Sequence, residues 1–212
     1  YPLRRQRQMC IRDRQKYASE IGLDKKTGIE ITESAPHVSD SYAVPSYIGQ
    51  GTNAYTTSQL ARYATAIATS GNVYDLTLLD RQTDSKGNTL KKYEPDIINT
   101  VDVSQNVWDD IHDGMYRVVQ THRQFDGLGV DVAGKTGTAE VNVYHPNHGM
   151  FVGYAPASDP EYAIAVRIEN GYTSGNACLA ADDIFKYIFE LTDEKSILTG
   201  VAASDTSDTS ND

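Results

Sequence analysis

The stretch AGKTGTAE, residues 133–140, places one lysine, two threonines and two glycines within eight consecutive positions. Alternation of apolar and polar residues over 139–144 predicts a strand, and the apolar runs at 148–155 and 162–169 predict two more. Short turns join these runs, so the three strands should form an antiparallel sheet. A helix predicted over 178–191 has an apolar stripe that packs on the sheet. The predicted fold class is therefore α+β, an antiparallel sheet with flanking helices.

Upstream of this sheet, the sequence predicts two well-marked helices and a hairpin. The helix at 56–70 begins with Thr56, and Gln59 three residues later completes a capping box. A second helix begins after Ser104 and carries Trp108, which we interpret as a core anchor. The remaining predicted elements are a helix that ends at Gly22, a short strand over 29–31, a loop over 33–46 and a hairpin formed by 73–81 and 89–93.

The two ends of the chain differ in composition from its middle. Residues 1–14 carry five of the ten arginines against one aspartate, a net charge of +4, and we interpret this segment as foreign to the domain. Residues 15–195 are expected to form the folded region. Residues 196–212 are poor in apolar side chains and are expected to form a disordered acidic tail rich in Ser and Thr.

Charge and hydropathy argue against several classes of function. The net charge is −10, which argues against nucleic acid as a partner because phosphate binding requires a basic surface. No apolar stretch approaches the length of about 18 residues that predicts a membrane span. Cys10 and Cys178 fit neither a disulfide framework nor a metal site, and no cofactor or metal is predicted.

A literal phosphate-loop pattern, G-x-x-x-x-G-K-[ST], occurs at residues 129–136, GVDVAGKT. That pattern binds phosphate only between a buried strand and a helix, because backbone N–H groups at a helix N-terminus must face the phosphates. Here the preceding residues 121–126 are polar, and residues 138–144 are expected to form a strand. The context fails on both sides, so we reject nucleotide binding.

Lys-Thr-Gly on a strand is also one of three signatures of serine β-lactamases and penicillin-binding proteins. Their chemistry needs a cation and hydroxyl groups to hold the carboxylate of a D-Ala-D-Ala terminus or of a penicillin. Lys135 supplies the charge, and Thr136 and Thr138 supply hydroxyl donors. Gly137 has no side chain, so substrate can lie against the strand. The backbone N–H of Thr138 can form part of an oxyanion hole.

The flanks distinguish this signature from a chance tripeptide, since a second Lys-Thr-Gly stands at 26–28. SYIGQGTNAYTTSQLARYATAIATSG at 46–71 precedes AGKTGTAE, and HGMFVGYAP at 148–156 and AIAVRIENG at 163–171 follow it. Over residues 16–191 the chain resembles class B penicillin-binding proteins, the monofunctional peptidoglycan D,D-transpeptidases of bacterial cell-wall synthesis. The family also has a segment similar to 26–28 well before its active-site copy.

The resemblance implies the transpeptidase fold shared with serine β-lactamases, here incomplete, and a reaction through an acyl-enzyme on a serine. In the family, Ser-x-x-Lys supplies that serine and Ser-x-Asn assists it, both before the segment that resembles residues 16–31. No Ser-x-x-Lys occurs here, so we expect a C-terminal fragment of the domain that is inactive alone. Ser174-Gly175-Asn176 is a literal Ser-x-Asn, but it follows the Lys-Thr-Gly strand and is interpreted as an ordinary turn.

The resemblance also implies ligands, location and partners. The ligands are stem peptides that end in D-Ala-D-Ala, and β-lactams. The parent protein would be anchored in the bacterial plasma membrane, with its domain on the extracytoplasmic face, and would associate with other proteins of cell-wall synthesis. Two alternatives share the fold: a β-lactam sensor domain, which lacks the block seen at 48–61, and a β-lactamase-like hydrolase, whose sequence after Lys-Thr-Gly differs.

A few further polar residues are candidates for a site. His145 and His148 form His-x-x-His, but the intervening Pro-Asn favours a turn over a metal pair. Glu140 lies on the same face as Thr138 by alternation, but the family assigns its general base elsewhere, so we interpret Glu140 as non-catalytic. Three residues after the third strand are candidates for the border of the substrate cleft: Tyr172, Thr173 and Ser174.

Overall fold

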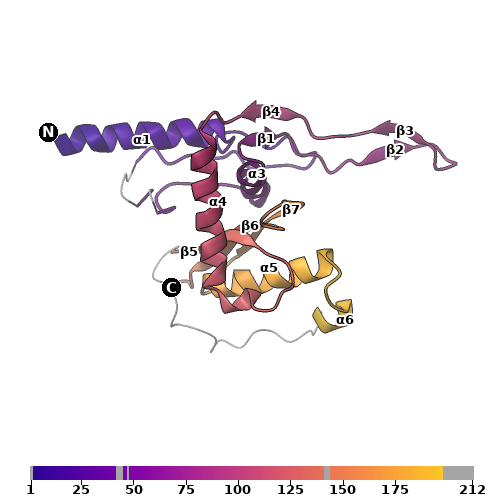
Figure 1. Ribbon diagram of the computed structural model, residues 1–212. Coiled ribbons are helices and arrows are strands. Elements are labelled where there is room, and N and C mark those ends of the chain that lie inside the picture. Colours follow the sequence, from indigo (N-terminus) through magenta and orange to yellow (C-terminus); the bar gives the residue numbers. More distant parts are fainter. Residues whose placement is uncertain (1, 42–44, 47, 141–143, 198–212) are drawn as a thin grey trace. The chain divides into compact units, whose positions relative to one another are not determined.

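The computed structural model describes residues 2–41, 45–46, 48–140 and 144–197 (Figure 1). The chain divides into two compact units, residues 1–103 and residues 104–212, which are described separately. Among the described helices, none has the length and apolar character that a membrane crossing requires.

The first unit contains helix α1, Pro2–Glu20, and helix α3, Thr57–Ala68. α3 begins as predicted, because the Thr56 side chain accepts a hydrogen bond from the Gln59 N–H (3.2 Å) and Gln59 Oε1 accepts one from the Thr56 N–H (2.8 Å). α1 ends just before Gly22, whose φ of +83° lies in the region that favours glycine. The helix is continuous across residue 14, so no break in secondary structure marks the predicted boundary there.

Two antiparallel strand pairs replace the single predicted hairpin. They are β1, Asn72–Tyr74, with β4, Ile97–Thr100, and β2, Arg81–Thr83, with β3, Thr89–Lys92 (Figure 1). The strand predicted over 73–81 is wrong because the chain leaves its ladder after Tyr74, where the Leu76 N–H donates to the Thr27 carbonyl (2.8 Å). The strand predicted over 29–31 is absent as well, because the Leu78 N–H donates to the Glu30 carboxylate (2.8 Å) rather than to its backbone.

A buried arginine of α3 holds the loop that contains the first Lys-Thr-Gly, residues 26–28. Arg62 is only 1% exposed. Its guanidinium donates to the carbonyls of Gly22, Lys25 (2.8 Å) and Lys26 (3.0 Å). A buried guanidinium is costly unless its donors are satisfied, and here backbone carbonyls satisfy them. This copy of Lys-Thr-Gly therefore has a structural role within the first unit.

Glu33 is a second buried charge in contact with this loop. Its carboxylate accepts hydrogen bonds from the N–H and hydroxyl of Thr27, both at 2.8 Å, and from the Ser58 hydroxyl at 2.7 Å. Burial is the largest single effect on the pKa and would raise it. The hydrogen bonds from Ser58 and Thr27, with a weaker one from Thr56, together outweigh burial, so the pKa of Glu33 lies below its ordinary value of 4.5.

Replacing Glu33 with glutamine is expected to lower the free energy of unfolding by about 1–3 kcal/mol at neutral pH, because an amide cannot accept all of these hydrogen bonds. The ionised carboxylate stabilises the fold above pH 4.5, and this contribution is lost as pH falls through the lower pKa of the folded state. Denaturant unfolding from neutral pH to about pH 3 should therefore show the two proteins converging. Asp102→Asn, at an exposed position of the same unit, is the control, and a constant difference at all pH values would contradict this role of Glu33.

The second unit is built on a three-stranded antiparallel sheet in the order β5–β6–β7. The strands are β5, Ala133–Ala139, β6, His148–Ala155, and β7, Tyr162–Ile168. The predictions of β6 and β7 are confirmed within one residue. The first strand was predicted over 139–144 and instead begins at Ala133, because Ala133 already pairs with Tyr154 of β6. It ends at Ala139, opposite the first residue of β6, and residues 141–143 of the predicted strand lie outside the described residues.

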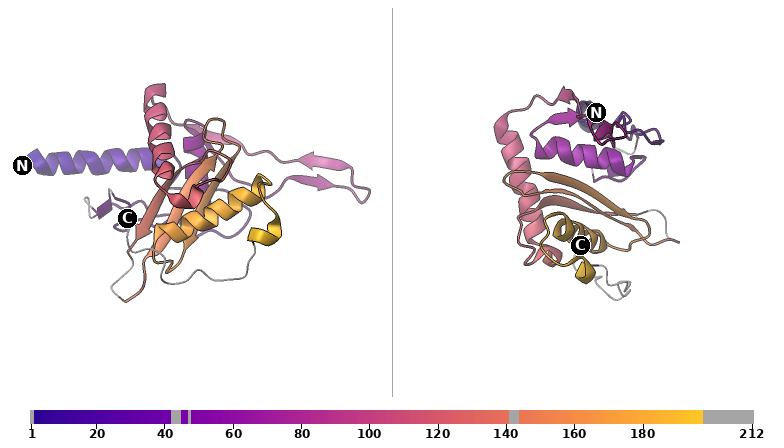
Figure 2. Two further views of the ribbon diagram at one scale, coloured as in Figure 1. Left: turned by 60° about the horizontal axis from the view of Figure 1, so that its bottom comes forward. Right: turned by 90° about the vertical axis from the view of Figure 1, so that its right-hand side faces the viewer.

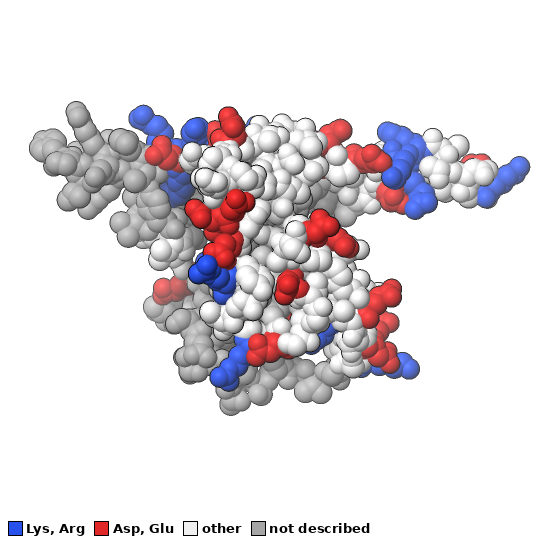
Figure 3. Space-filling view, viewed as in Figure 1, with Lys and Arg blue, Asp and Glu red and all other residues white. Residues whose placement is uncertain are grey.

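The helices of the second unit are α4, Gln105–Gln120, the 3-10 helix η1, Arg123–Phe125, α5, Ser174–Ile188, and α6, Glu194–Ile197. α4 begins after Ser104 as predicted, and Trp108 is confirmed as a core residue at 5% exposure. Acidic side chains gather over α4, whose exposed positions include 109, 110 and 113 (Figure 3). The negative charge of the chain is thus concentrated in part on this helix.

Helix α5 lies across one face of the sheet (Figure 2). The core at this face includes Phe151 of β6 and Ala177, Cys178, Ala181 and Phe185 of α5. The predicted stripe is partly wrong, since α5 begins four residues before 178 and its Leu179 and Ile184 are exposed. Close approach explains the use of small residues here: a Cβ on Gly149 of β6 would lie 2.3 Å from the carbonyl oxygen of Thr173, the N-cap of α5.

Candidate active site

Strand β5 carries the second Lys-Thr-Gly, residues 135–137, at an edge of the sheet. Residues 150–152 of β6 stand opposite this segment, and among the described residues no strand pairs with the other edge of β5. An open strand edge presents backbone N–H and C=O groups to an extended ligand, as in recognition by β-strand addition. The position of β5 therefore suits the binding of a peptide.

Side chains of β5 alternate between the two faces of the sheet. Thr136 stands opposite Phe151, which packs in the core with α5, so Thr136 and Thr138 lie on the face toward α5. Lys135 and Gly137 lie on the other face. A ligand along the open edge of β5 is therefore placed to meet both Lys135 and Thr136.

Two hydrogen bonds tie these side chains to their surroundings. The Lys135 side chain is exposed, and its ammonium donates a hydrogen bond to the carbonyl of Thr136 (2.8 Å). This bond uses one of the three N–H donors of the ammonium. The Thr138 hydroxyl accepts a hydrogen bond from the N–H of Ser174 (3.2 Å), the first residue of α5. Thr138 thus joins the end of β5 to the start of the helix, and Lys135 keeps donors for a ligand.

The glycines of the sheet differ in what surrounds them. A Cβ on Gly153 would lie 2.6 Å from the carbonyl oxygen of Ala133, so the fold itself excludes a side chain at Gly153. A Cβ on Gly137 would meet the Met150 Cβ at 3.5 Å, an ordinary van der Waals contact. The described fold therefore does not require glycine at 137.

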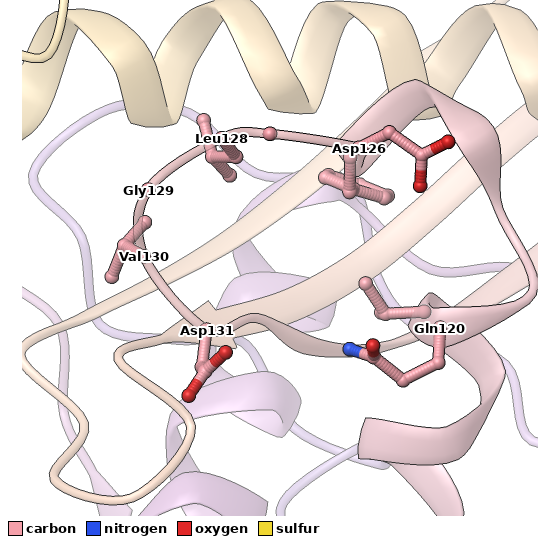
Figure 4. A pocket seen from close by; sticks show the side chains of 9 residues that line it. Gln120, Asp126, Leu128, Gly129, Val130 and Asp131 are labelled. Atoms are coloured by element: carbon pink, nitrogen blue, oxygen red, sulfur yellow. The ribbon is translucent and has the colours of Figure 1, made fainter.

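The loop before β5 contains the first half of the literal phosphate-loop pattern, residues 129–132 (Figure 4). Its residues 125–131 line, with Val119 and Gln120, a pocket with a volume of about 330 Å³. The lining includes the carboxylates of Asp126 and Asp131, which repel phosphate. The pattern is preceded by the 3-10 helix η1, and its residues 133–136 already belong to strand β5, so neither the preceding strand nor the following helix of a phosphate loop flanks it.

Ser174-Gly175-Asn176 forms the first turn of α5, so the prediction of an ordinary turn is wrong. Ser174 is buried, and the Asn176 side chain donates to the Gly171 carbonyl (2.9 Å). The helix start was missed because its first turn has no large apolar residue. Tyr172 is 54% exposed with a φ of +64°, and it stays a candidate for the border of a cleft.

One polar pair on the sheet was missed by the sequence patterns. Arg167 of β7 lies beside His148 of β6, with 3.0 Å between Arg167 Nη2 and His148 Nε2. The available signal was an arginine within the otherwise apolar run of β7, residues 162–168. Glu140 and His145 are exposed.

Comparisons with known proteins agree with this geometry. The family described as Penicillin binding protein transpeptidase domain matches residues 3–190. Penicillin-binding protein 2B of Streptococcus pneumoniae R6 is 32% identical in a match that covers 69% of this chain and 24% of that protein. The peptidoglycan D,D-transpeptidase MrdA of Acinetobacter baumannii is 29% identical in a match that covers 85% of this chain and 31% of that protein.

Solved structures give the same result. Penicillin-binding protein 2B of S. pneumoniae R6 has a TM-score of 0.71 at 26% identity, over 84% of this chain and 33% of that chain. Penicillin-binding protein A of Mycobacterium tuberculosis, as an acyl-enzyme complex with ceftriaxone, has a TM-score of 0.71 at 25% identity, over 82% of this chain and 42% of that chain. The chain thus spans about a quarter to a third of the curated relatives in length. The α+β fold is confirmed, and the chain belongs to the penicillin-binding protein transpeptidase family, of which it carries a partial domain of the class B type.

Proposed function

We propose that this chain supplies the Lys-Thr-Gly strand of a peptidoglycan D,D-transpeptidase, an enzyme that cross-links cell-wall peptides and is acylated by penicillins. The observation that carries the proposal is Gly137 on the open edge of β5, beside an exposed lysine and within a sheet that does not itself require the glycine. Relatives named as D,D-transpeptidases support the reaction class.

The strand would bind the peptide and stabilise its reacting carbonyl. Lys135 and Thr136 hold the terminal carboxylate of D-Ala-D-Ala, or the carboxylate of a β-lactam, by charge-assisted hydrogen bonds. The backbone N–H of Thr138 donates to the oxyanion that forms when the carbonyl is attacked, and one such donor contributes roughly 3–4 kcal/mol to transition-state stabilisation. The peptide lies along β5 as an added strand.

The attacking serine is proposed to come from the part of the domain that lies outside these 212 residues. The sequence holds no Ser-x-x-Lys, and the Ser-x-Asn at 174–176 is built into the first turn of α5, where Ser174 is buried. Acylation would thus require two parts of one domain: the segment that carries the nucleophilic serine and the carboxylate-binding strand β5.

The proposed setting is the extracytoplasmic face of the bacterial plasma membrane, with other cell-wall synthesis proteins as partners. A β-lactam sensor domain and a β-lactamase-like hydrolase are less well supported, because the relatives reported above are named penicillin-binding proteins or D,D-transpeptidases. A hydrolase would also be distinguished by its product, a free acid instead of a cross-linked peptide.

Labelled benzylpenicillin tests the proposal directly. The full-length protein that carries this sequence is expected to form a covalent adduct that survives denaturing electrophoresis, because penicillins acylate the serine. The 212-residue chain is expected to form none, since it lacks Ser-x-x-Lys. An adduct on the 212-residue chain, or none on the full-length protein, would show that the proposed division of the active site is wrong.

A further inference from the structure

The start of helix α5 lies directly over the end of strand β5 that carries Thr138. Thr138 stands opposite Gly149 of β6, and a Cβ on Gly149 would lie 2.3 Å from the carbonyl oxygen of Thr173, the N-cap of α5. Glycine at 149 therefore lets the helix start rest on the ladder between β5 and β6. Ser174, the first residue of the helix, is then close enough to donate its N–H to the Thr138 hydroxyl (3.2 Å).

This hydrogen bond takes the place of a local cap. The first N–H groups of a helix have no partner within the helix, and the side chain of the N-cap residue usually accepts a hydrogen bond from one of them. Within the described part of the chain, the Thr173 side chain makes no such bond. Thr138, 36 residues earlier, supplies an acceptor for the first N–H of α5. The helix start and the strand end therefore hold one another.

Two further hydrogen bonds fix the segment that leads into α5. The Tyr172 N–H donates to the carbonyl of Asn147 (3.0 Å), the residue just before β6. The Asn176 side chain, in the first turn of the helix, reaches back and donates to the Gly171 carbonyl (2.9 Å). The N–H of Ser174 is thus fixed in position by contacts on both sides of it, so it can in turn hold a partner on β5.

Thr138 occupies a position at which a strand opens easily. It is the last residue but one of β5, Ala133–Ala139, and no described strand pairs with the outer edge of β5. The ends of elements open at lower free energy than their centres. A donor to an oxyanion must nevertheless be held in place before the reaction, because a displacement of about 1 Å can cost about 100-fold in rate.

We propose that the N–H of Ser174 is a positioning group for the oxyanion donor. By holding the Thr138 hydroxyl, it holds the backbone N–H of the same residue at the place where the reacting carbonyl binds. Gly149 is a second positioning residue, because a larger residue there would push the start of α5 away from Thr138. The inference rests on the proposed function, since it takes the N–H of Thr138 to be the oxyanion donor. Neither Ser174 nor Gly149 touches the substrate, and each acts through Thr138.

The test measures acylation of the full-length protein by a fluorescent penicillin over a range of concentrations. Such data separate the dissociation constant of the first, noncovalent complex from the rate constant of acylation. Ser174→Pro removes the N–H and places a ring carbon where its hydrogen pointed. Proline is favoured at the first position of a helix, and Thr173 (φ −133°, ψ 161°) has the extended conformation that a residue before proline requires.

Relative to Ser174→Ala, which keeps the N–H, Ser174→Pro is expected to lower the rate constant of acylation about tenfold, as for one hydrogen bond. The dissociation constant should stay within about twofold, because an oxyanion donor acts in the transition state and not in the first complex. Gln105→Pro is the matched control for proline. Gln105 is exposed, begins α4 and follows the extended Ser104 (φ −64°, ψ 149°), so this variant should acylate at the wild-type rate.

Variants of Thr138 show whether the effect passes through its hydroxyl. Thr138→Ala removes the acceptor, so adding Ser174→Pro to it should cause no further loss. Thr138→Ser keeps the acceptor, so adding Ser174→Pro to it should again lower the rate constant about tenfold.

The carbonyl stretch of the acyl-enzyme, measured by infrared spectroscopy with an isotope-labelled penicillin, reports the oxyanion donor directly. A hydrogen bond to the carbonyl lowers this frequency, so Ser174→Pro and Thr138→Ala should both shift the band to higher frequency. A purely structural role would lower stability without moving the band. If Ser174→Pro does not fold, the band of Thr138→Ala compared with that of Thr138→Ser decides the question.

The outcomes separate this inference from the proposed function. Equal rate constants in Ser174→Pro and Ser174→Ala, an undiminished loss in the Thr138→Ala background, or an unshifted carbonyl band would each overturn the inference and leave the proposed function in place. An equal loss of rate in Gln105→Pro would overturn it too, since the effect would then come from proline at any helix start. Absence of acylation in the wild-type protein would instead overturn the proposed function, and this inference with it.

Discussion

Replacing Phe151 with alanine should destabilise the second unit by about 3–5 kcal/mol, a large share of the about 5–15 kcal/mol that stabilises a typical domain. Phe151 is fully buried between β5 and α5, and its ring centroid lies 5.2 Å from that of Phe125. A Cβ on Gly134 would lie 2.3 Å from the Phe151 ring, which therefore rests on the bare backbone of β5. Alanine would leave a cavity that neither the strand nor the helix can fill.

Denaturant unfolding followed by circular dichroism measures the Phe151 effect. Tyr187→Ala is the matched control, because Tyr187 is an aromatic residue of α5 that is 61% exposed, and its loss should change stability by less than about 0.5 kcal/mol. Phe151→Leu should lie between the two, since it retains part of the buried volume. A loss below about 1 kcal/mol for Phe151→Ala would contradict the packing of α5 on β6 described above.

Replacing Lys135 with alanine is expected to slow acylation of the full-length protein by labelled penicillin at least about 100-fold. One charged donor to a group that is held in the transition state contributes roughly 3 kcal/mol, and each 1.36 kcal/mol is tenfold in rate. Gly137→Ala should also slow acylation, by about tenfold, because a methyl group would separate the ligand from the strand. The second-order acylation rate, measured by fluorescent penicillin, reports both effects.

The chain provides its own control for Lys135. Lys26 is the exposed lysine of the other Lys-Thr-Gly copy, residues 26–28. Its carbonyl, rather than its side chain, contacts Arg62. Lys26→Ala should therefore acylate at the wild-type rate and keep its stability. Gly137→Ala should also keep its stability, since the added Cβ meets Met150 at 3.5 Å. An acylation rate of Lys135→Ala within about threefold of the wild-type rate, or an equal loss of rate in Lys26→Ala, would show that Lys135 does not bind the carboxylate.

Local patterns predicted the elements whose signals lie within a few residues. The capping box at Thr56 and Gln59, the apolar runs of β6 and β7, and the helix that begins after Ser104 were all predicted. Each depends on contacts between sequence neighbours or on the regular spacing of apolar residues along one face of a helix or strand. The elements that were missed depend on distant partners. The extent of β5 depends on Tyr154, and the split of the predicted hairpin depends on the bond from Leu76 to Thr27.

The start of α5 also depends on residues that are distant in the sequence. Its first turn contains Ser, Gly and Asn, which favour turns in isolation. Ser174 is helical because its N–H is satisfied by Thr138, 36 residues earlier in the chain, and because small residues let the helix approach β6. Neither condition is visible in a local pattern, since each is a property of the packed sheet and helix.

By itself, the sequence determined the α+β class and the family and predicted a role for residues 135–138, because these depend on residue types in order along the chain. Only the tertiary structure decided which Lys-Thr-Gly is available to a ligand. The copy at 26–28 has its backbone engaged by Arg62, 36 residues away from Lys26, whereas the copy at 135–137 lies on an open edge. Tertiary structure also brought His148 and Arg167 together, because strand pairing sets which side chains share a face. A short local sequence does not specify which strand pairs with it.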